Sequence, residues 1–135
     1  MSAETAQNKA IVRRLYEDVW NRGDLAAADE ILTQPSGVQA YVSQFRSAFP
    51  DVHHTVVTTI AEEDAVMVHW TAQATHLGQW HGLEATGARV GWSGVTIAHL
   101  VDGKIERHHT VWDALALLEQ VGAVPRIRKA DGSRL

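Results

Sequence analysis

Apolar residues recur every three to four positions in the first third of the chain, the spacing that places them on one face of an α-helix. Gly23 is suited to end the first of these stretches, and Asp24 is suited to cap the second. Ser36 and Gln39 have the spacing of a capping box at the start of the third. The pattern therefore predicts three N-terminal helices, over residues 10–20, 25–32 and 36–49.

After Pro50 apolar and polar residues alternate and β-branched side chains become frequent, which is typical of strands with one buried face. Asp102 and Gly103 predict a tight hairpin turn, and Asp113 most simply caps a last short helix that ends at Gly122. The predicted strands are 51–62, 66–76, 89–101 and 104–113, and the last helix is 114–121. Helices followed by strands predict an α+β fold, with about four long antiparallel strands packed on three N-terminal helices.

The 135 residues predict a single domain at 1–122, followed by a polar, basic tail at 123–135. The absence of cysteine excludes disulfides and cysteine nucleophiles. A formal charge of −4, with no basic run in the body of the chain, argues against nucleic acid as a partner. No apolar stretch reaches the length of a membrane span and the N-terminus lacks a signal core, so we expect a cytoplasmic protein with no membrane partner.

The stretch KIERHHTVWD, residues 104–113, carries side chains that can do chemistry. Alternation along a strand predicts that Glu106, His108, Thr110 and Trp112 share one face. His109 then points away from His108, so the two rings cannot bind one metal ion. No metal-ligand spacing, phosphate loop or dinucleotide motif is found elsewhere, and we expect neither a metal nor another cofactor.

Five tryptophans and eight histidines are unusual in so short a chain. Indoles can form flat walls for an aromatic or polyene ligand, although core filling is the alternative for at least two of them. The tryptophans considered as ligand-binding residues are Trp20, Trp70, Trp80, Trp92 and Trp112.

Four segments, NKAIVRRLYEDVWNRGD, AFPDVHHTVV, VHWTAQATHLGQWHGLEATGARV and DGKIERHHTVWD, resemble the SnoaL-like polyketide cyclases. This family has the nuclear transport factor 2-like fold, and the resemblance runs from about Asn8 to Gly122. It implies a curved sheet wrapped around helices into a cone with an apolar pocket, and a homodimer that pairs through the sheet. It also implies a small hydrophobic or aromatic substrate. The enzyme would remove a proton from a carbon next to a carbonyl group, and a new ring would then close within the substrate.

Two features depart from the family pattern. The connection between the second and third helices is short, where family members usually carry a strand pair that closes part of the cone. Thr110 matches the aspartate that ring-closing members use, and a threonine cannot act as a carboxylate base. The usual catalytic role is therefore not carried over to position 110.

The resemblance places the face that contains His108 inward. We expect His108 to act as base or acid, oriented by Glu106, with His54 or Tyr16 stabilising the carbonyl oxygen. One alternative is that Glu106 lies in water at the hairpin end and His108 is a core histidine. His54 interrupts an apolar row, so it needs a ligand or, alternatively, a neighbouring hydroxyl or water as partner. The expected substrate-binding residues are Tyr16, Trp20, Trp70, His76, Trp80, Trp92, Thr110 and Trp112, with His76 at the pocket mouth.

A domain that binds a ligand or a partner without turnover is the rival interpretation, because the same scaffold hosts both kinds of protein. The threonine at position 110 and the short helix connection both favour this rival. Hydroxylation, epoxide opening and pericyclic ring closure are further reactions compatible with the scaffold.

Overall fold

The computed structural model describes residues 2–125 and 129–133. The helices are α1 (Ala3–Arg14), α2 (Leu25–Ile31), α3 (Ser36–Ala48) and α4 (Ala114–Gln120), with a π-helical segment η1 (Leu15–Trp20) that continues α1. The strands are β1 (His53–Glu62), β2 (Ala65–Thr75), β3 (Arg89–Val101) and β4 (Lys104–Trp112). The predicted α+β class and the predicted order of elements are confirmed.

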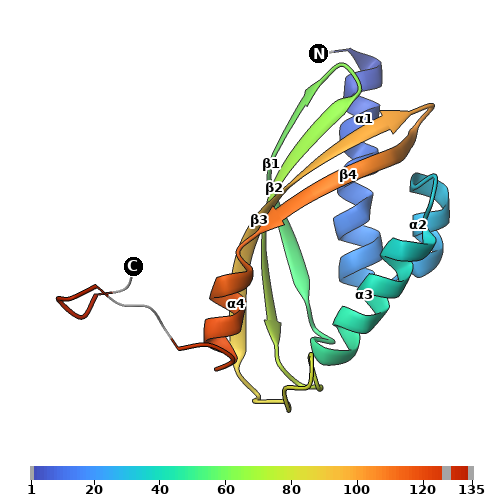
Figure 1. Cartoon of the computed structure of the whole chain (residues 1–135). Helices are drawn as coiled ribbons and strands as arrows, with labels where there is room; N and C mark the ends of the chain where they lie inside the picture. The colour runs from blue at the N-terminus through green and yellow to red at the C-terminus, as the bar shows by residue number, and fades with distance from the viewer. Residues whose placement is uncertain (1, 126–128, 134–135) are drawn as a thin grey trace.

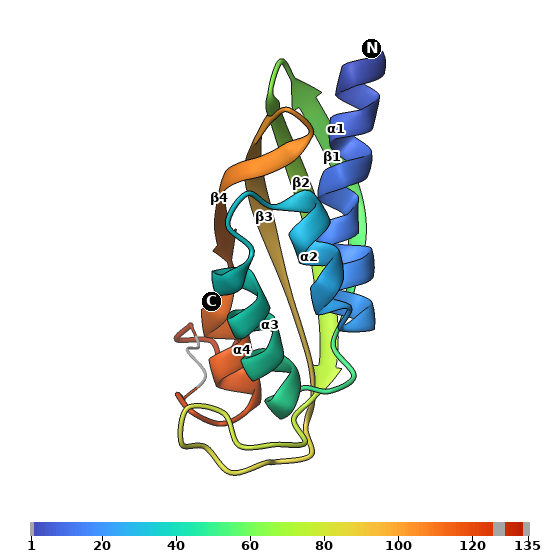
Figure 2. The same cartoon turned by 90° about the vertical axis from the view of Figure 1, so that its right-hand side faces the viewer.

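The four strands form one antiparallel sheet in the order β1-β2-β3-β4. The sheet is curved, and α1, α2 and α3 lie against one of its faces, while α4 follows the end of β4 (Figure 1). Turned by 90°, the three N-terminal helices stand in front of the sheet (Figure 2). This arrangement confirms the predicted cone. The tail prediction for residues 126–128 and 134–135 lies outside the described residues.

Alternation along the two central strands determines which side chains face the helices. Every second residue of β2 from Val66 to Ala74, and of β3 from Val90 to Leu100, is buried. The intervening residues of both strands are half-buried or exposed, because they form the outer face of the sheet. The inner row of β3 contains Thr96, a polar residue that is fully buried.

Two of the predicted helix caps are confirmed. Asp24 Oδ1 accepts a hydrogen bond from the amide of Ala27 at 3.3 Å, and Asp113 Oδ1 accepts one from Ala116 at 3.0 Å. The hairpin turn is also as predicted, because Asp102 and Gly103 both have positive φ angles, of 50° and 77°.

The capping box predicted at Ser36 is wrong. Pro35 already has helical backbone angles and precedes α3 as its cap residue, and its carbonyl accepts from the amide of Gln39 at 2.9 Å. Ser36 is therefore inside the first turn. The Gln39 side chain instead donates to the carbonyl of Leu25 at 2.8 Å and to Asp29 at 3.1 Å, which ties α3 to α2.

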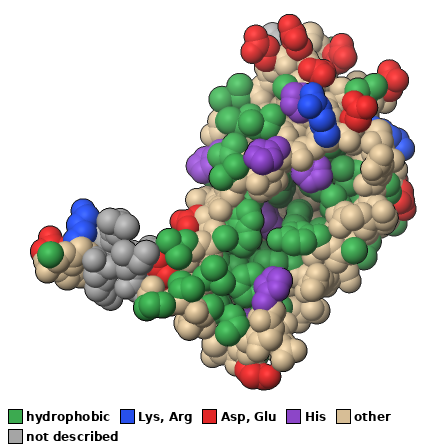
Figure 3. Space-filling model, in the orientation of Figure 1, with side chains coloured by type: hydrophobic (Ala, Val, Ile, Leu, Met, Phe, Trp, Pro, Cys, Tyr) green, Lys and Arg blue, Asp and Glu red, His purple; other side chains and the backbone are tan. Residues whose placement is uncertain are grey.

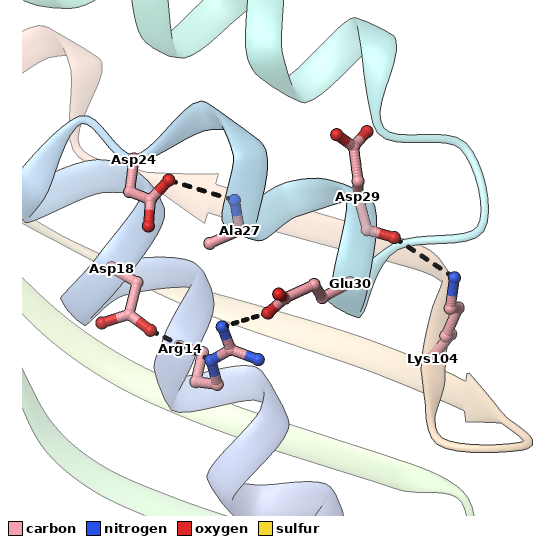
Figure 4. Close-up of polar contacts among 7 residues, drawn as sticks. All are labelled: Arg14, Asp18, Asp24, Ala27, Asp29, Glu30 and Lys104. Atoms are coloured by element: carbon pink, nitrogen blue, oxygen red, sulfur yellow. Dashed lines mark hydrogen bonds and ion pairs between the residues drawn. The ribbon is translucent and has the colours of Figure 1, made fainter.

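Charged side chains hold α2 beside α1 and the start of β4 (Figure 4). Arg14 donates to Asp18 at 3.0 Å and to Glu30 at 2.6 Å, and Lys104 Nζ donates to the carbonyl of Asp29 at 3.2 Å. Such solvent-exposed pairs are typically worth less than about 1 kcal/mol each. Burial of the apolar face of α2 is therefore the main contribution to its position.

The connection between α2 and α3 is as short as the sequence predicts. Leu32 forms a parallel bridge with Ile105 of β4, and the amide of Thr33 donates to the Ile105 carbonyl at 3.0 Å. Past this point, no strand of the described residues pairs with the outer edge of β4. Within the described part of the chain, no helix has the length and apolar character needed to cross a membrane.

Candidate active site

A cavity of about 550 Å³ lies between the sheet, η1, α3 and β4. Hydrophobic side chains and histidines gather over the middle of the molecule on this side (Figure 3). The cavity is lined by Leu15, Tyr16, Trp20, Gln34, Gly37, Val38, Tyr41, Phe45, His54, Trp70, Trp92, His108, His109, Thr110 and Trp112. None of these described lining residues is a lysine, arginine, aspartate or glutamate. A buried charge needs a partner, so the cavity favours an uncharged, largely apolar ligand.

The pairing of β4 with β3 contradicts the expected face of Glu106. His108 pairs with Ala98 and Arg107 with His99, but Ile105, not Glu106, pairs with the next residue of β3. Glu106 is thus the extra residue of a β-bulge, and the fully buried Ile105 takes the inward position. Glu106 is exposed, lies outside the cavity and makes no hydrogen bond to His108 within the described structure. The prediction that it orients His108 is wrong in geometry.

His108 lies on the cavity wall and remains partly open to solvent. Partial desolvation lowers the pKa of His108 from its ordinary value of 6.5. A neutral imidazole is therefore the main form near neutral pH. His108 is therefore not a buried core histidine, which was one alternative. Glu106 does lie in solvent, as the same alternative predicted.

His54 is 4% exposed and reaches the cavity from β1. Its ring lies among aromatic groups, with its centroid 4.9 Å from those of Trp20 and Trp70 and 5.4 Å from that of Tyr16. Desolvation, with a smaller contribution from His53, lowers the pKa of His54 to about 3. Its Nδ1 atom is buried without a hydrogen-bond partner in the described structure. The hydroxyl that one alternative offered as a partner is thus not found at this atom among the described residues, and His54 is a neutral polar group at physiological pH.

The backbone of His54 is clamped by Asn21, just after η1. The amide oxygen of Asn21 accepts from the His54 amide at 2.7 Å, and its nitrogen donates to the His54 carbonyl at 2.8 Å. No sequence pattern pointed to Asn21. Its paired hydrogen bonds fix the histidine relative to the helix that carries Tyr16 and Trp20.

Three hydroxyl groups form a connected network beside the cavity. Thr96 Oγ1 is hydrogen-bonded to the Tyr16 hydroxyl and, at 2.8 Å, to Thr110 Oγ1. The indole nitrogen of Trp70 donates to the same Thr96 oxygen at 3.2 Å. Burial raises the pKa of Tyr16 to about 12, and its hydrogen bonds only partly oppose this rise. Tyr16 therefore remains a neutral phenol, and Thr96 is a central residue that the sequence did not reveal.

We expect Thr96→Val to lower the free energy of unfolding by about 2 kcal/mol, because the buried Tyr16 hydroxyl and Trp70 N–H lose their common hydrogen-bond partner. Urea unfolding of wild type and variant measures the difference. The matched control is Thr71→Val on the exposed outer face of β2, which should change stability by less than about 0.5 kcal/mol. Equal stability of the two variants would show that the network contributes little.

Two expected pocket residues lie elsewhere. His76 is fully buried, stacks on Phe49 with ring centroids 5.2 Å apart, and places Nδ1 3.0 Å from the Thr86 hydroxyl. Trp80 packs edge-on against Phe49 at 5.5 Å. Strand alternation does not extend this far, because β2 ends at Thr75 and the chain then bonds the end of α3. Neither side chain lines the cavity.

The other four tryptophans, Trp20, Trp70, Trp92 and Trp112, all line the cavity, and their contact with a ligand stays a prediction. Val38, Tyr41 and Phe45 of α3 also face the cavity, although the sequence pattern showed them only as one stripe of a helix. A helical stripe gives the same signal for a core and for a pocket wall. The described residues contain no group of three or more histidines and carboxylates that could hold a metal ion.

Several solved structures are similar to this chain. AclR from Streptomyces galilaeus, a candidate hydroxylase, is 29% identical over 94% of this chain and 88% of its own, with a TM-score of 0.84. A candidate SnoaL-like polyketide cyclase from Jannaschia sp. CCS1 is 23% identical over 93% of this chain and 98% of its own, with a TM-score of 0.84. IdmH from Streptomyces antibioticus, a candidate polyketide cyclase, is 23% identical over 86% of this chain and 99% of its own, with a TM-score of 0.78.

A search of curated proteins gave no match. The sequence profile of the SnoaL-like polyketide cyclases matches residues 10–121, which include every element from η1 to α4 and every residue that lines the cavity. The sequence match, the curved sheet around helices and the aromatic cavity agree, and the chain therefore belongs to the SnoaL-like polyketide cyclase family.

Proposed function

We propose that this chain is an enzyme that binds an uncharged, flat polyketide-like substrate and promotes its ring closure by general acid–base chemistry. The observation that carries the proposal is the cavity itself. Seven of its fifteen lining residues are phenylalanine, tyrosine or tryptophan, and histidines line it from both edge strands of the sheet, His54 from β1 and His108 and His109 from β4. Apolar walls with a few convergent polar groups are typical of small-molecule sites.

In the proposed reaction, the neutral ring of His108 removes a proton from a carbon next to a carbonyl group. The resulting enolate carbon attacks a second carbonyl carbon of the same molecule, and a carbon–carbon bond forms. The imidazolium of His108 then returns its proton to the new alkoxide oxygen, so that protons balance. His54 lies deeper and contributes a polar contact without titrating near neutral pH.

The position of Thr110 supports a histidine as the base. A threonine hydroxyl does not ionise in the ordinary pH range, and the cavity lining described here contains no carboxylate. A histidine with a lowered pKa is a modest base, which suffices for a carbon acid flanked by two carbonyl groups. The cavity would contribute mainly by folding the substrate so that its reacting carbons lie close together.

Hydroxylation is a second candidate activity, because AclR is described as a candidate hydroxylase and is 29% identical to this chain. The rival of a binding domain without turnover concerns the same cavity. A hydroxylase would give a hydroxylated product, and a binding domain would give no product. Analysis of the products therefore separates both from ring closure.

The proposal is tested by incubating the protein with a panel of neutral poly-β-ketone mimics and detecting ring-closed products by mass spectrometry. Gly37→Trp should lower turnover by about tenfold to a hundredfold by misplacing the substrate. Gly37 lines the cavity, and a Cβ added there meets no atom within 4 Å, so the fold can accept the change. The matched control is Ala40→Trp, at an exposed position of α3 outside the cavity.

The expected result is turnover above the uncatalysed rate in wild type and Ala40→Trp, and turnover lower by about tenfold to a hundredfold in Gly37→Trp. Binding of the mimics without any acceleration would favour the binding domain. Equal turnover in all three proteins would place the reaction outside this cavity.

A further inference from the structure

The three hydroxyls beside the cavity have one hydrogen atom more than the two bonds between them use. Each hydroxyl has one hydrogen and two lone pairs, and the indole N–H of Trp70 can only donate. Trp70 therefore occupies one lone pair of Thr96 Oγ1. The two bonds from Thr96, to Tyr16 and to Thr110, use two of the three hydroxyl hydrogens. The third hydrogen must remain at one end of the chain, on Tyr16 or on Thr110.

Burial decides between the two ends. Tyr16 also lines the cavity, but it is only 3% exposed, and its hydroxyl is hydrogen-bonded to the buried Thr96. Leaving the free hydrogen there would cost roughly 1–3 kcal/mol, a factor of about five or more in population. Thr110 is exposed and lines the cavity, where its hydrogen can reach water or a ligand. The chain therefore runs in one direction, from Tyr16 to Thr96 to Thr110 and then into the cavity.

We infer that Thr110 is a specificity-determining hydrogen-bond donor, held in that role by Tyr16 and Thr96, and that it binds a carbonyl oxygen of the ligand. This inference rests on the proposed function, which places the ligand in the cavity. It adds that a carbonyl oxygen is the group of the ligand that Thr110 binds. Thr96 acts as a positioning residue, since it does not line the cavity. Ketones, quinones and enolates present the acceptor oxygen that this donor requires.

The position of Thr110 also suits the proposed reaction. His108 and Thr110 are both on the inner face of β4, where two residues of strand rise separate their Cα atoms by about 6.6 Å. A carbonyl oxygen bound to Thr110 then directs the adjacent C–H group along the strand toward His108. As that C–H group loses its proton, negative charge develops on the oxygen that Thr110 already contacts, and the hydrogen bond strengthens.

The test uses 9-fluorenone as the probe and fluorene, the same ring system without the carbonyl, as the matched ligand. Infrared difference spectra of ¹³C-labelled fluorenone report the carbonyl stretch, which falls when the oxygen accepts a hydrogen bond. In wild type and Thr110→Ser we expect a lowered stretch. In Thr110→Val we expect this lowering to be lost, with fluorenone affinity weaker by roughly threefold to tenfold and fluorene affinity unchanged.

Tyr16→Phe gives the decisive comparison, and it keeps the test valid if Thr110→Val does not fold. Under the inferred direction Thr96 still donates to Thr110, so the lowered stretch persists in Tyr16→Phe. Under the opposite direction Tyr16→Phe loses it and Thr110→Val keeps it, which would overturn the inference. Absence of fluorenone binding to wild type, or a stretch that is not lowered there, would also overturn it. The infrared and affinity measurements involve no turnover. Their outcome is therefore independent of whether the protein catalyses ring closure.

Discussion

Replacing His108 with alanine is expected to lower kcat/KM for ring closure by about 10²–10⁴-fold, the usual contribution of a positioned general base. Burial leaves His54 with a pKa of about 3, too low for a useful base. Burial raises the pKa of Tyr16 to about 12, so its phenol remains protonated. His108 lines the cavity, and partial desolvation lowers its pKa, so its ring is neutral and can accept a proton. Steady-state kinetics with the best mimic of the panel measure the loss.

The matched control for this change is His69→Ala, a histidine on the outer face of β2 that does not line the cavity. Its kinetics should equal those of wild type. The partly solvent-exposed position of His108 means that truncation leaves no sealed void, so both variants should unfold at similar temperatures. If His108→Ala keeps the wild-type rate and only binds the substrate less tightly, the base has been assigned to the wrong residue.

The pH dependence follows from the same assignment. The base is the neutral ring, and partial desolvation lowers the pKa of His108 below 6.5. The rate should therefore be constant at neutral and mildly alkaline pH and should fall as the pH drops through the lowered pKa. The residual rate of His108→Ala should lack this acid limb. A wild-type midpoint above 6.5 would contradict a desolvated histidine as the base.

Local patterns predicted the fold well because each element obeys its own periodicity. The helical stripes, the alternation after Pro50 and the hairpin at Asp102 and Gly103 all depend on neighbours within a few residues. The error at Ser36 has a local cause too, since Pro35 adopts helical angles and shifts the start of α3. The π-helical segment from Leu15 to Trp20 was not predicted, because six residues are too few to distinguish its period from that of an α-helix.

The site was less predictable, because it depends on register and on tertiary contacts. Alternation placed His108, Thr110 and Trp112 on the cavity side of β4, and all three line the cavity, but His109, which was expected to point away, lines it too. The same count failed at Glu106, because a single extra residue moves a side chain to the opposite face of a sheet. The role of Thr96 depends on Tyr16, which is 80 positions away along the chain. No spacing rule connects two such residues, so only the packed structure brings them together.

Glycine 94 explains how two large indoles can flank the same part of the cavity. It pairs with Trp70 on one side and with Trp112 on the other, and the Trp70 ring and the Cβ of Trp112 lie next to a position that has no side chain. A Cβ added there would lie 2.4 and 2.7 Å from Cζ2 and Cη2 of Trp70, and 2.8 Å from Cβ of Trp112. The Trp70 ring cannot move freely, because its nitrogen is bonded to Thr96. The sequence shows the tryptophans, but not the space that they require.

Gly94→Ala is therefore expected to lower the free energy of unfolding by about 3 kcal/mol, at the upper end of the usual cost of overpacking. The matched control is Gly91→Ala on the same strand, where the added Cβ would meet only the Ala72 carbonyl at an ordinary 3.5 Å. Alanine restricts the unfolded chain more than glycine does, so the control should gain up to about 1 kcal/mol. Urea unfolding, followed by tryptophan fluorescence, measures both variants.

The opposite signs expected for these two variants separate a packing effect from a general preference of the strand for alanine. Gly94→Ala should also weaken fluorenone binding, because the displaced Trp70 ring loses its bond to Thr96 and with it part of the support for Thr110. If Gly94→Ala is as stable as Gly91→Ala, the indoles can move away at little cost. The shape of the cavity would then be set by mobile side chains, and the directional hydroxyl chain that ends at Thr110 would lose its rigid support.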